Sequence, residues 1–147
     1  MLAAAAALFM ATGKQTYLTS GNETLYALVF GSTKLEMDGI LFEQSCDANA
    51  CTETSEESDR WAFKGITMRG VQYFLDAANN PDLTAIYSAW IGFQAAAITK
   101  NAVSSDGIGN VWYRSSPQKI NSIGEISAIS AGNAAVKYGA NDGTFTC

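Results

Sequence analysis

The chain has 147 residues, of which 48% are hydrophobic and 16% are charged, the balance of a folded domain rather than of a disordered segment. Its net charge of −5 comes without any cluster of Lys or Arg, which argues against a nucleic-acid partner. It contains no histidine, so any acid–base chemistry must fall to Asp, Glu, Lys or Tyr. We expect no metal and no cofactor, because no cluster of ligand residues exists. No apolar run reaches the ~18 residues of a membrane span.

Two helices are expected at the start of the chain. The first is an alanine-rich helix over residues 1–12, which ends at Gly13. A signal segment is the alternative, but this stretch is short and lacks a basic start. The second helix follows almost at once, over residues 16–30, and Gly21 weakens its middle. Within it, Asn22 begins the triplet Asn-Glu-Thr, an acceptor for N-glycosylation that also arises by chance.

Residues 31–60 are mostly polar and irregular, with one apolar patch at residues 40–42. Cys46 and Cys51 stand at a spacing that fits a small-loop disulfide, which would add about 2 kcal/mol in the chain-entropy model. Two free thiols in a reducing cell are the alternative, and no second ligand pair follows that would indicate a zinc site. Together with the glycosylation triplet, the pair favours an oxidising compartment. Cys147 is then left over, for another chain or for a residue outside this sequence.

The middle of the chain predicts two longer helices. Over residues 61–78 the apolar residues recur at helical spacing on more than one face, which is typical of a helix packed between others. A second helix is expected over residues 81–100, with Asn80 as its cap and proline at its first position. Tyr87 and Trp90 lie on its apolar stripe, so we expect both to pack in the core.

The sequence SSDGIGN, residues 104–110, breaks the chain after this helix. A last helix is then expected with Ser116 as its cap and Pro117 at its first position, and it should end at Tyr138 before Gly139. No stretch alternates with period two, so the predicted class is all-α. Helices of this length separated by loops suggest paired helices, which are typical of an α/α toroid or of a helical repeat.

Four segments stand in order along the chain: AAAAALFMATGKQTYL, GILFEQSCDANAC, FKGITMRGVQYFL, and a tryptophan followed by small residues. In this order they resemble the C-terminal half of fungal family 76 glycoside hydrolases, the endo-α-1,6-mannanases and their cell-wall relatives. The resemblance covers residues 1–130, and LFEQSC and FKGI are its most specific pieces. It implies that residues 1–147 form a single domain, the C-terminal half of an (α/α)6 barrel of paired helices. The ordered set argues against a generic helical-repeat interaction protein.

The resemblance also implies a function. Family members act on α-1,6-mannan chains in fungal cell-wall biogenesis, by hydrolysis or by transfer, at a secreted or cell-surface location. A polysaccharide would be the partner. Cys46 and Cys51 would form a disulfide that pins the long loop before the FKG helix. Phe63 and Lys64, at the start of that helix, would face a sugar-binding groove; a core phenylalanine and a solvated lysine are the alternative.

The catalytic residues expected of such an enzyme are missing. Glycoside cleavage needs two carboxylates at a fixed separation. In the family these are an adjacent aspartate pair, in the half of the barrel that precedes what resembles residue 1 here. This sequence contains no Asp-Asp, and its neighbouring acids Glu56 and Glu57 fit a solvated loop. We therefore assign no catalytic residue. The alternative function is a truncated, non-catalytic helical module that binds mannan or self-associates through unpaired helix faces.

Acidic and aromatic residues in loops are further candidates for sugar contact, because carboxylates accept hydrogen bonds from hydroxyls and sugars stack on flat rings. Glu43 flanks the cysteine loop, Asp106 lies in the DGIGN turn, and Trp112 follows it. Asp106 has a plain alternative role in shaping the turn, and Trp112 one in filling the core. The predicted substrate-binding residues are thus Glu43, Phe63, Lys64, Asp106 and Trp112.

Overall fold

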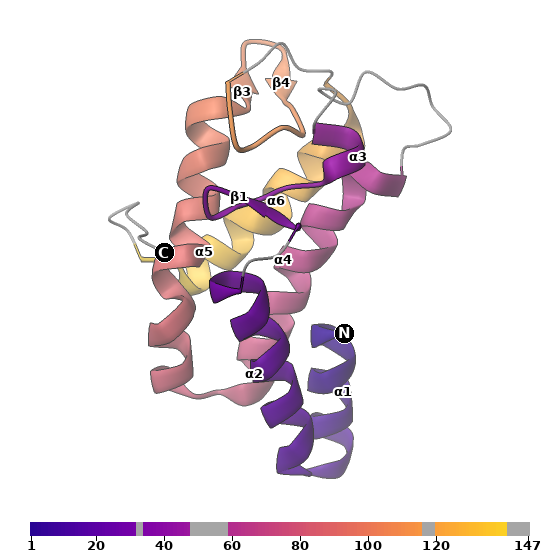
Figure 1. Ribbon diagram of the computed structural model, residues 1–147, viewed down its shortest axis with the longest axis vertical. Helices are drawn as coiled ribbons and strands as arrows, with labels where there is room; N and C mark the ends of the chain where they lie inside the picture. Colours follow the sequence, from indigo (N-terminus) through magenta and orange to yellow (C-terminus); the bar gives the residue numbers. More distant parts are fainter. Residues whose placement is uncertain (32–33, 48–58, 116–119, 141–147) are drawn as a thin grey trace.

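The computed structural model describes residues 1–31, 34–47, 59–115 and 120–140, and long helices dominate them (Figure 1). The elements in chain order are α1 (Leu2–Thr12), α2 (Gln15–Phe30), β1 (Glu36–Met37), β2 (Ile40–Leu41), α3 (Gln44–Asp47), α4 (Asp59–Ala78), α5 (Pro81–Asn101), β3 (Val103–Ser104), β4 (Gly107–Ile108) and α6 (Ser122–Tyr138). The predicted all-α class is therefore confirmed. None of the described helices is both long and apolar enough to cross a membrane.

The long helices pack as neighbours around α4. This helix lies between α1 and α6, while α2 packs on α1 and α5 packs on α6 (Figure 1). On the side of α2, a Cβ on Gly21 would overlap the ring of Phe74 from α4, at 2.3 Å from its nearest atom. This close approach explains why a glycine stands in the middle of a helix.

One hydrophobic core joins these helices. Tyr87, Trp90 and Ile91 of α5 are fully buried in it, and so are Met68 and Val71 of α4. The prediction that Tyr87 and Trp90 pack in the core is confirmed. Both helices thus present large side chains to this core.

The first four long helices fall within two residues of their predicted bounds, and local signals account for one end of α1 and one of α5. Gly13 ends α1 in the left-handed conformation, with φ of 66°. Asn80 caps α5: its Oδ1 accepts hydrogen bonds from the backbone N–H groups of Asp82 at 2.9 Å and Leu83 at 3.1 Å. Both caps were predicted and are confirmed.

The predicted start of the last helix is wrong. α6 begins at Ser122, and Asn121 is its cap, accepting a hydrogen bond from Gly124 N–H at 2.7 Å. Ile120 pairs with Gly109 in an isolated β-bridge, which holds the backbone extended just before the helix. The predicted cap Ser116 and the proline after it, Pro117, lie outside the described residues.

Two β-hairpins interrupt the helical pattern, and neither was predicted. In the first, β1 pairs antiparallel with β2 around Asp38 and Gly39, whose φ values of 54° and 76° fit a two-residue type I′ turn. In the second, β3 pairs with β4 around Ser105 and Asp106. The sequence Asp-Gly is a hairpin signal at both places, but strands of two residues are too short for alternation to show.

Polar side chains of α5 hold the β1–β2 hairpin. Gln94 is fully buried, where its Nε2 donates to the carbonyl of Gly39 at 2.8 Å and its Oε1 accepts from Leu41 N–H at 2.9 Å. Trp90 Nε1 donates to Glu36 Oε1 at 2.7 Å. Burial raises the pKa of the Glu36 carboxyl to about 7, although the hydrogen bond from Trp90 acts in the opposite direction. One edge of the hairpin is therefore held by a carboxyl that titrates near neutrality.

The contact between α4 and α6 depends on a glycine. A Cβ on Gly65 would lie 2.5 Å from Cα of Ser127, whose Oγ donates to the carbonyl of Trp61 at 2.8 Å. A side chain at this position would therefore meet backbone atoms, which cannot move aside as a flexible side chain could.

We expect Gly65→Ala to lower the free energy of unfolding by about 1–3 kcal/mol, because the added methyl forces α4 and α6 apart. Gly132→Ala on α6 is the matched control, since no atom lies within 4 Å of its Cβ. That variant should gain about 0.5–1 kcal/mol from helix propensity alone. Urea unfolding followed by circular dichroism measures both. Equal stabilities of the two variants would contradict the close contact.

The Glu36 carboxyl should make stability depend on pH. Its pKa is raised from 4.5 to about 7 in the folded state, so between these values the folded chain holds the proton more tightly than the unfolded chain. Its contribution to stability is therefore present below pH ~4.5 and is lost as the pH rises toward ~7. Glu36→Gln keeps an oxygen for Trp90 and removes this loss, so its unfolding free energy should fall less across that window than that of the wild type. Glu23→Gln, at an exposed position of α2, should follow the wild type. Parallel curves for wild type and Glu36→Gln would refute the assignment.

Candidate functional site

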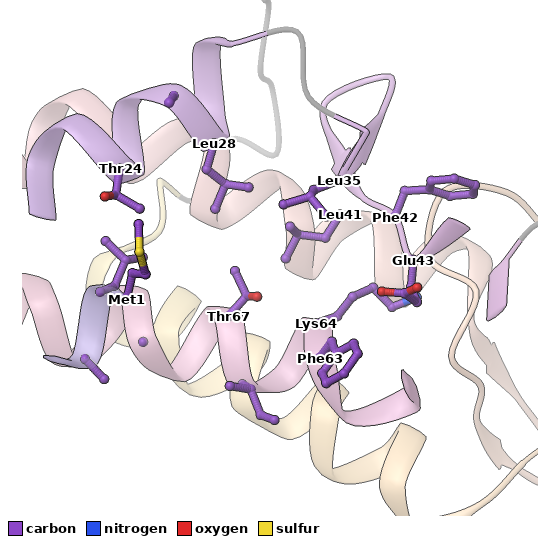
Figure 2. A pocket seen from close by; sticks show the side chains of 15 residues that line it. Met1, Thr24, Leu28, Leu35, Leu41, Phe42, Glu43, Phe63, Lys64 and Thr67 are labelled. Atoms are coloured by element: carbon purple, nitrogen blue, oxygen red, sulfur yellow. The ribbon is translucent and has the colours of Figure 1, made fainter. Parts of the chain in front are cut away.

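A groove of about 430 Å³ opens between α2 and α4. The start of α1 bounds one end, and the β1–β2 hairpin with the segment before α3 bounds the other (Figure 2). Figure 2 shows Thr24 and Leu28 of α2, together with Leu35 and Leu41, opposite Thr67 of α4. Most of the lining is apolar, and its charged side chains, Glu43 and Lys64, lie at the hairpin end.

Three of the predicted sugar contacts lie together at the hairpin end of the groove. Glu43, Phe63 and Lys64 all line it. Phe63 is 48% exposed and Glu43 is half-buried, whereas Lys64 is only 3% exposed. The alternative to a groove-facing pair, a core phenylalanine and a solvated lysine, is therefore wrong in both parts. Phe63 is not in the core, and Lys64 is not solvated.

Lys64 reaches from α4 into a buried polar cluster. Its Nζ donates to both carboxylate oxygens of Asp47, each at 2.6 Å, and to the backbone carbonyl of Asn110. It also lies 5.2 Å from the centre of the Trp112 ring, within the range of a cation–π contact. Asp47 is fully buried, and its Oδ2 accepts a further hydrogen bond from Glu43 N–H at 3.1 Å. The ion pair thus joins α3, α4 and the segment after β4.

Burial and charge act in opposite directions on this pair. Burial raises the pKa of the Asp47 carboxyl and lowers the pKa of the Lys64 ammonium, while their mutual attraction and hydrogen bonds oppose both shifts. The Glu43 carboxylate raises the pKa of both groups, by repulsion of Asp47 and attraction of Lys64. Two carboxylates therefore act on one ammonium, Asp47 by direct contact and Glu43 through its charge. Within the described part of the chain, no group of three or more His, Cys, Asp or Glu side chains could hold a metal ion.

The structure does not bring the other two predicted contacts to the groove. Trp112 is fully buried in the core, so it fills the core and offers no face to a sugar. Asp106 lies in the exposed β3–β4 turn, where its Oδ1 accepts from Ser105 Oγ at 3.1 Å and its N–H donates to Ser104 Oγ at 3.3 Å. It shapes the turn and lies outside the groove lining.

The modification and cross-link predictions stay predictions. Asn22 is half-buried on α2, and its Oδ1 accepts a hydrogen bond from the Tyr87 hydroxyl at 2.6 Å. The side chains of the predicted disulfide, the leftover cysteine and the adjacent glutamates fall outside what the structure describes: Cys46, Cys51, Cys147, Glu56 and Glu57.

Sequence reasoning missed the partner of Lys64. One signal was present, since Lys64 shares a face of α4 with the buried Met68 and Val71, and a charge at such a position needs a partner. No spacing pointed to Asp47, because it comes from a separate segment 17 residues earlier. Gln94, which secures the groove wall from α5, was missed because it lies within an otherwise apolar stripe.

Removing one member of the buried pair leaves the other charge uncompensated, which costs about 3–5 kcal/mol. We expect Lys64→Met and Asp47→Leu each to lower the free energy of unfolding by about that amount, and D47L/K64M to recover most of the loss. Urea unfolding at constant pH measures the three variants. The control is the exposed pair of Lys137 and Asp76, joined at 2.6 Å, where Lys137→Met should cost far less because solvent screens the charges. Losses that simply add in D47L/K64M would argue against a buried pair.

Comparison with known proteins places the fold. Residues 1–141 match the family model described as Glycosyl hydrolase family 76. Among solved structures, the chain is similar to the GH76A α-1,6-mannanase from Salegentibacter sp. HEL1_6, with a TM-score of 0.72 and 22% sequence identity. The match covers 93% of this chain and 38% of that chain. A search of curated proteins finds no match.

A second solved structure matches with the same score, identity and coverage. It is an inactive variant of that mannanase, with two consecutive aspartates replaced by asparagine, in complex with α-1,6-mannotriose. At this level of identity the two structures establish the fold, and the predicted architecture, part of an α/α barrel, is confirmed. That this part is the C-terminal half stays a prediction. The family model, which spans nearly the whole sequence, establishes more: the chain belongs to glycosyl hydrolase family 76.

Proposed function

We propose that this chain supplies part of the substrate-binding groove of a glycoside hydrolase or transglycosidase that acts on α-1,6-mannan. The observation that carries the proposal is the family match over residues 1–141. The groove supports it, because Phe63 offers an exposed ring for sugar stacking and Glu43 a carboxylate for sugar hydroxyls. The solved relatives are an α-1,6-mannanase and its complex with α-1,6-mannotriose, of which this chain spans 38% of the length.

Binding without cleavage is the activity we expect from these residues alone. The two-carboxylate mechanism needs an acid and a nucleophile or base at a fixed separation. The sequence contains no Asp-Asp, and the inactive relative is altered at two consecutive aspartates. The same observation favours the second candidate function, a non-catalytic mannan-binding module. The two candidates differ in whether a polypeptide that carries the acids completes the groove.

We also propose a secreted or cell-surface location, in the setting of cell-wall biogenesis. An oxidising compartment suits the cysteine pair Cys46 and Cys51, and the Asn22 triplet fits the same compartment.

Self-association through unpaired helix faces is part of the proposal too. Large apolar side chains of α4 and α6 are about half exposed or more, and exposed apolar patches mark interaction surfaces. They are Ile66, Tyr73, Ile126, Ile129 and Val136.

Titration calorimetry with α-1,6-mannotriose tests the binding function. We expect the wild type to bind, and Phe63→Ala to weaken binding about tenfold, a loss of about 1.4 kcal/mol. Tyr73→Ala is the matched control, because Phe63 and Tyr73 are both on α4 and both 48% exposed, yet only Phe63 lines the groove. Incubation with α-1,6-mannan should release no new reducing ends.

Two results would count against the proposal. If the wild type does not bind mannotriose, or if Tyr73→Ala weakens binding as much as Phe63→Ala, the groove is not a mannan site. If new reducing ends appear, the expectation that these residues bind without cleaving is wrong.

A further inference from the structure

Glu43 is held through both of its backbone groups by one residue. Its N–H donates to Asp47 Oδ2 at 3.1 Å, and its carbonyl accepts the Asp47 N–H at 2.7 Å. These two bonds fix the main chain just before α3, at the point where the Glu43 side chain meets the groove. The position of that side chain therefore depends on Asp47 staying in place.

Asp47 is in turn held by Lys64. An ammonium has three N–H donors, and the acceptors of Lys64 Nζ are the two Asp47 oxygens and the carbonyl of Asn110. The side chain is 3% exposed, so it has neither a spare donor nor the surface to bind a sugar. Lys64 was predicted to contact the substrate, and this geometry assigns it a different task.

We propose that Asp47 and Lys64 are positioning residues, which act through Glu43 and hold its carboxylate at the hairpin end of the groove. The proposal rests on the proposed function only in treating Glu43 as a sugar contact. The holding of Glu43 itself rests on the described hydrogen bonds.

Phe63 precedes Lys64 on α4, and consecutive helical side chains point about 100° apart. With Lys64 in the buried cluster, Phe63 lines the groove, where it is 48% exposed. Its direction follows from the helix itself, so the ion pair acts on the site through Glu43.

A mutant cycle on mannotriose binding tests whether the pair acts through Glu43. We expect Glu43→Gln and D47L/K64M each to weaken binding about tenfold, and the combined triple variant to bind no worse than Glu43→Gln alone, because coupled effects do not add. The control D76L/K137M removes the exposed ion pair of α4 and α6 and should bind as the wild type does. A triple variant weakened by the product of the two factors would overturn the proposal.

Hydrogen exchange at the Glu43 amide gives a readout that does not involve sugar. We expect this amide to exchange at least tenfold faster in D47L/K64M than in the wild type, with the amides of α4 unchanged. An unchanged rate at Glu43 would overturn the proposal.

If the wild type binds no mannotriose, the proposed function fails and this exchange rate alone decides the positioning role. Should D47L/K64M not fold, Asp47→Glu keeps the charge and displaces the carboxylate, and it should also speed exchange at Glu43; an unchanged rate there would again overturn the proposal.

Discussion

The buried ion pair of Lys64 and Asp47 is the interaction on which the hairpin end of the groove depends. At the other end of the bundle, short turns join α1 to α2 and α4 to α5. At this end the connections are long, and both converge on Lys64: Asp47 belongs to the first and Asn110 to the second. Burying two charges is costly unless every hydrogen-bonding group is satisfied. Asp47 and the Asn110 carbonyl are therefore fixed relative to α4 by a contact that tolerates little displacement.

How far the fold could be predicted depended on whether the deciding contacts were local. The ends of α1 and α5 follow from Gly13 and Asn80, whose effects act within one helical turn. The start of α6 was misplaced because its decisive contact is the pairing of Ile120 with Gly109, which local sequence does not show. The resemblance to the mannanases supplied the architecture, which helical periodicity alone had left open between a toroid and a repeat.

For the site, too, success depended on whether the sequence around a residue showed its surroundings. The resemblance predicted Phe63 beside a groove, and Glu43 was chosen as an acidic residue that flanks the cysteine loop; the structure places both in the groove lining. Trp112 was misjudged because it lies outside every helical stripe, so nothing local showed whether its ring faces the core or the solvent. Lys64 was placed at the groove, but its ion pair was not foreseen, since its partner Asp47 could be recognised only once α3 was seen to pack on α4.

The lining of the groove separates binding from chemistry. Sugar hydroxyls need hydrogen-bonding partners, and between α2 and α4 the walls offer the hydroxyls of Thr24 and Thr67, whereas the charged side chains of the lining, Glu43 and Lys64, lie at the hairpin end. The ion pair that fixes this end lies wholly within the described residues, whereas no adjacent aspartates occur anywhere in the sequence. Under the proposed function, the contacts that hold a sugar and the acids that would cleave its linkage therefore belong to different parts of the barrel. In that case the affinity for mannan would not depend on the catalytic pair.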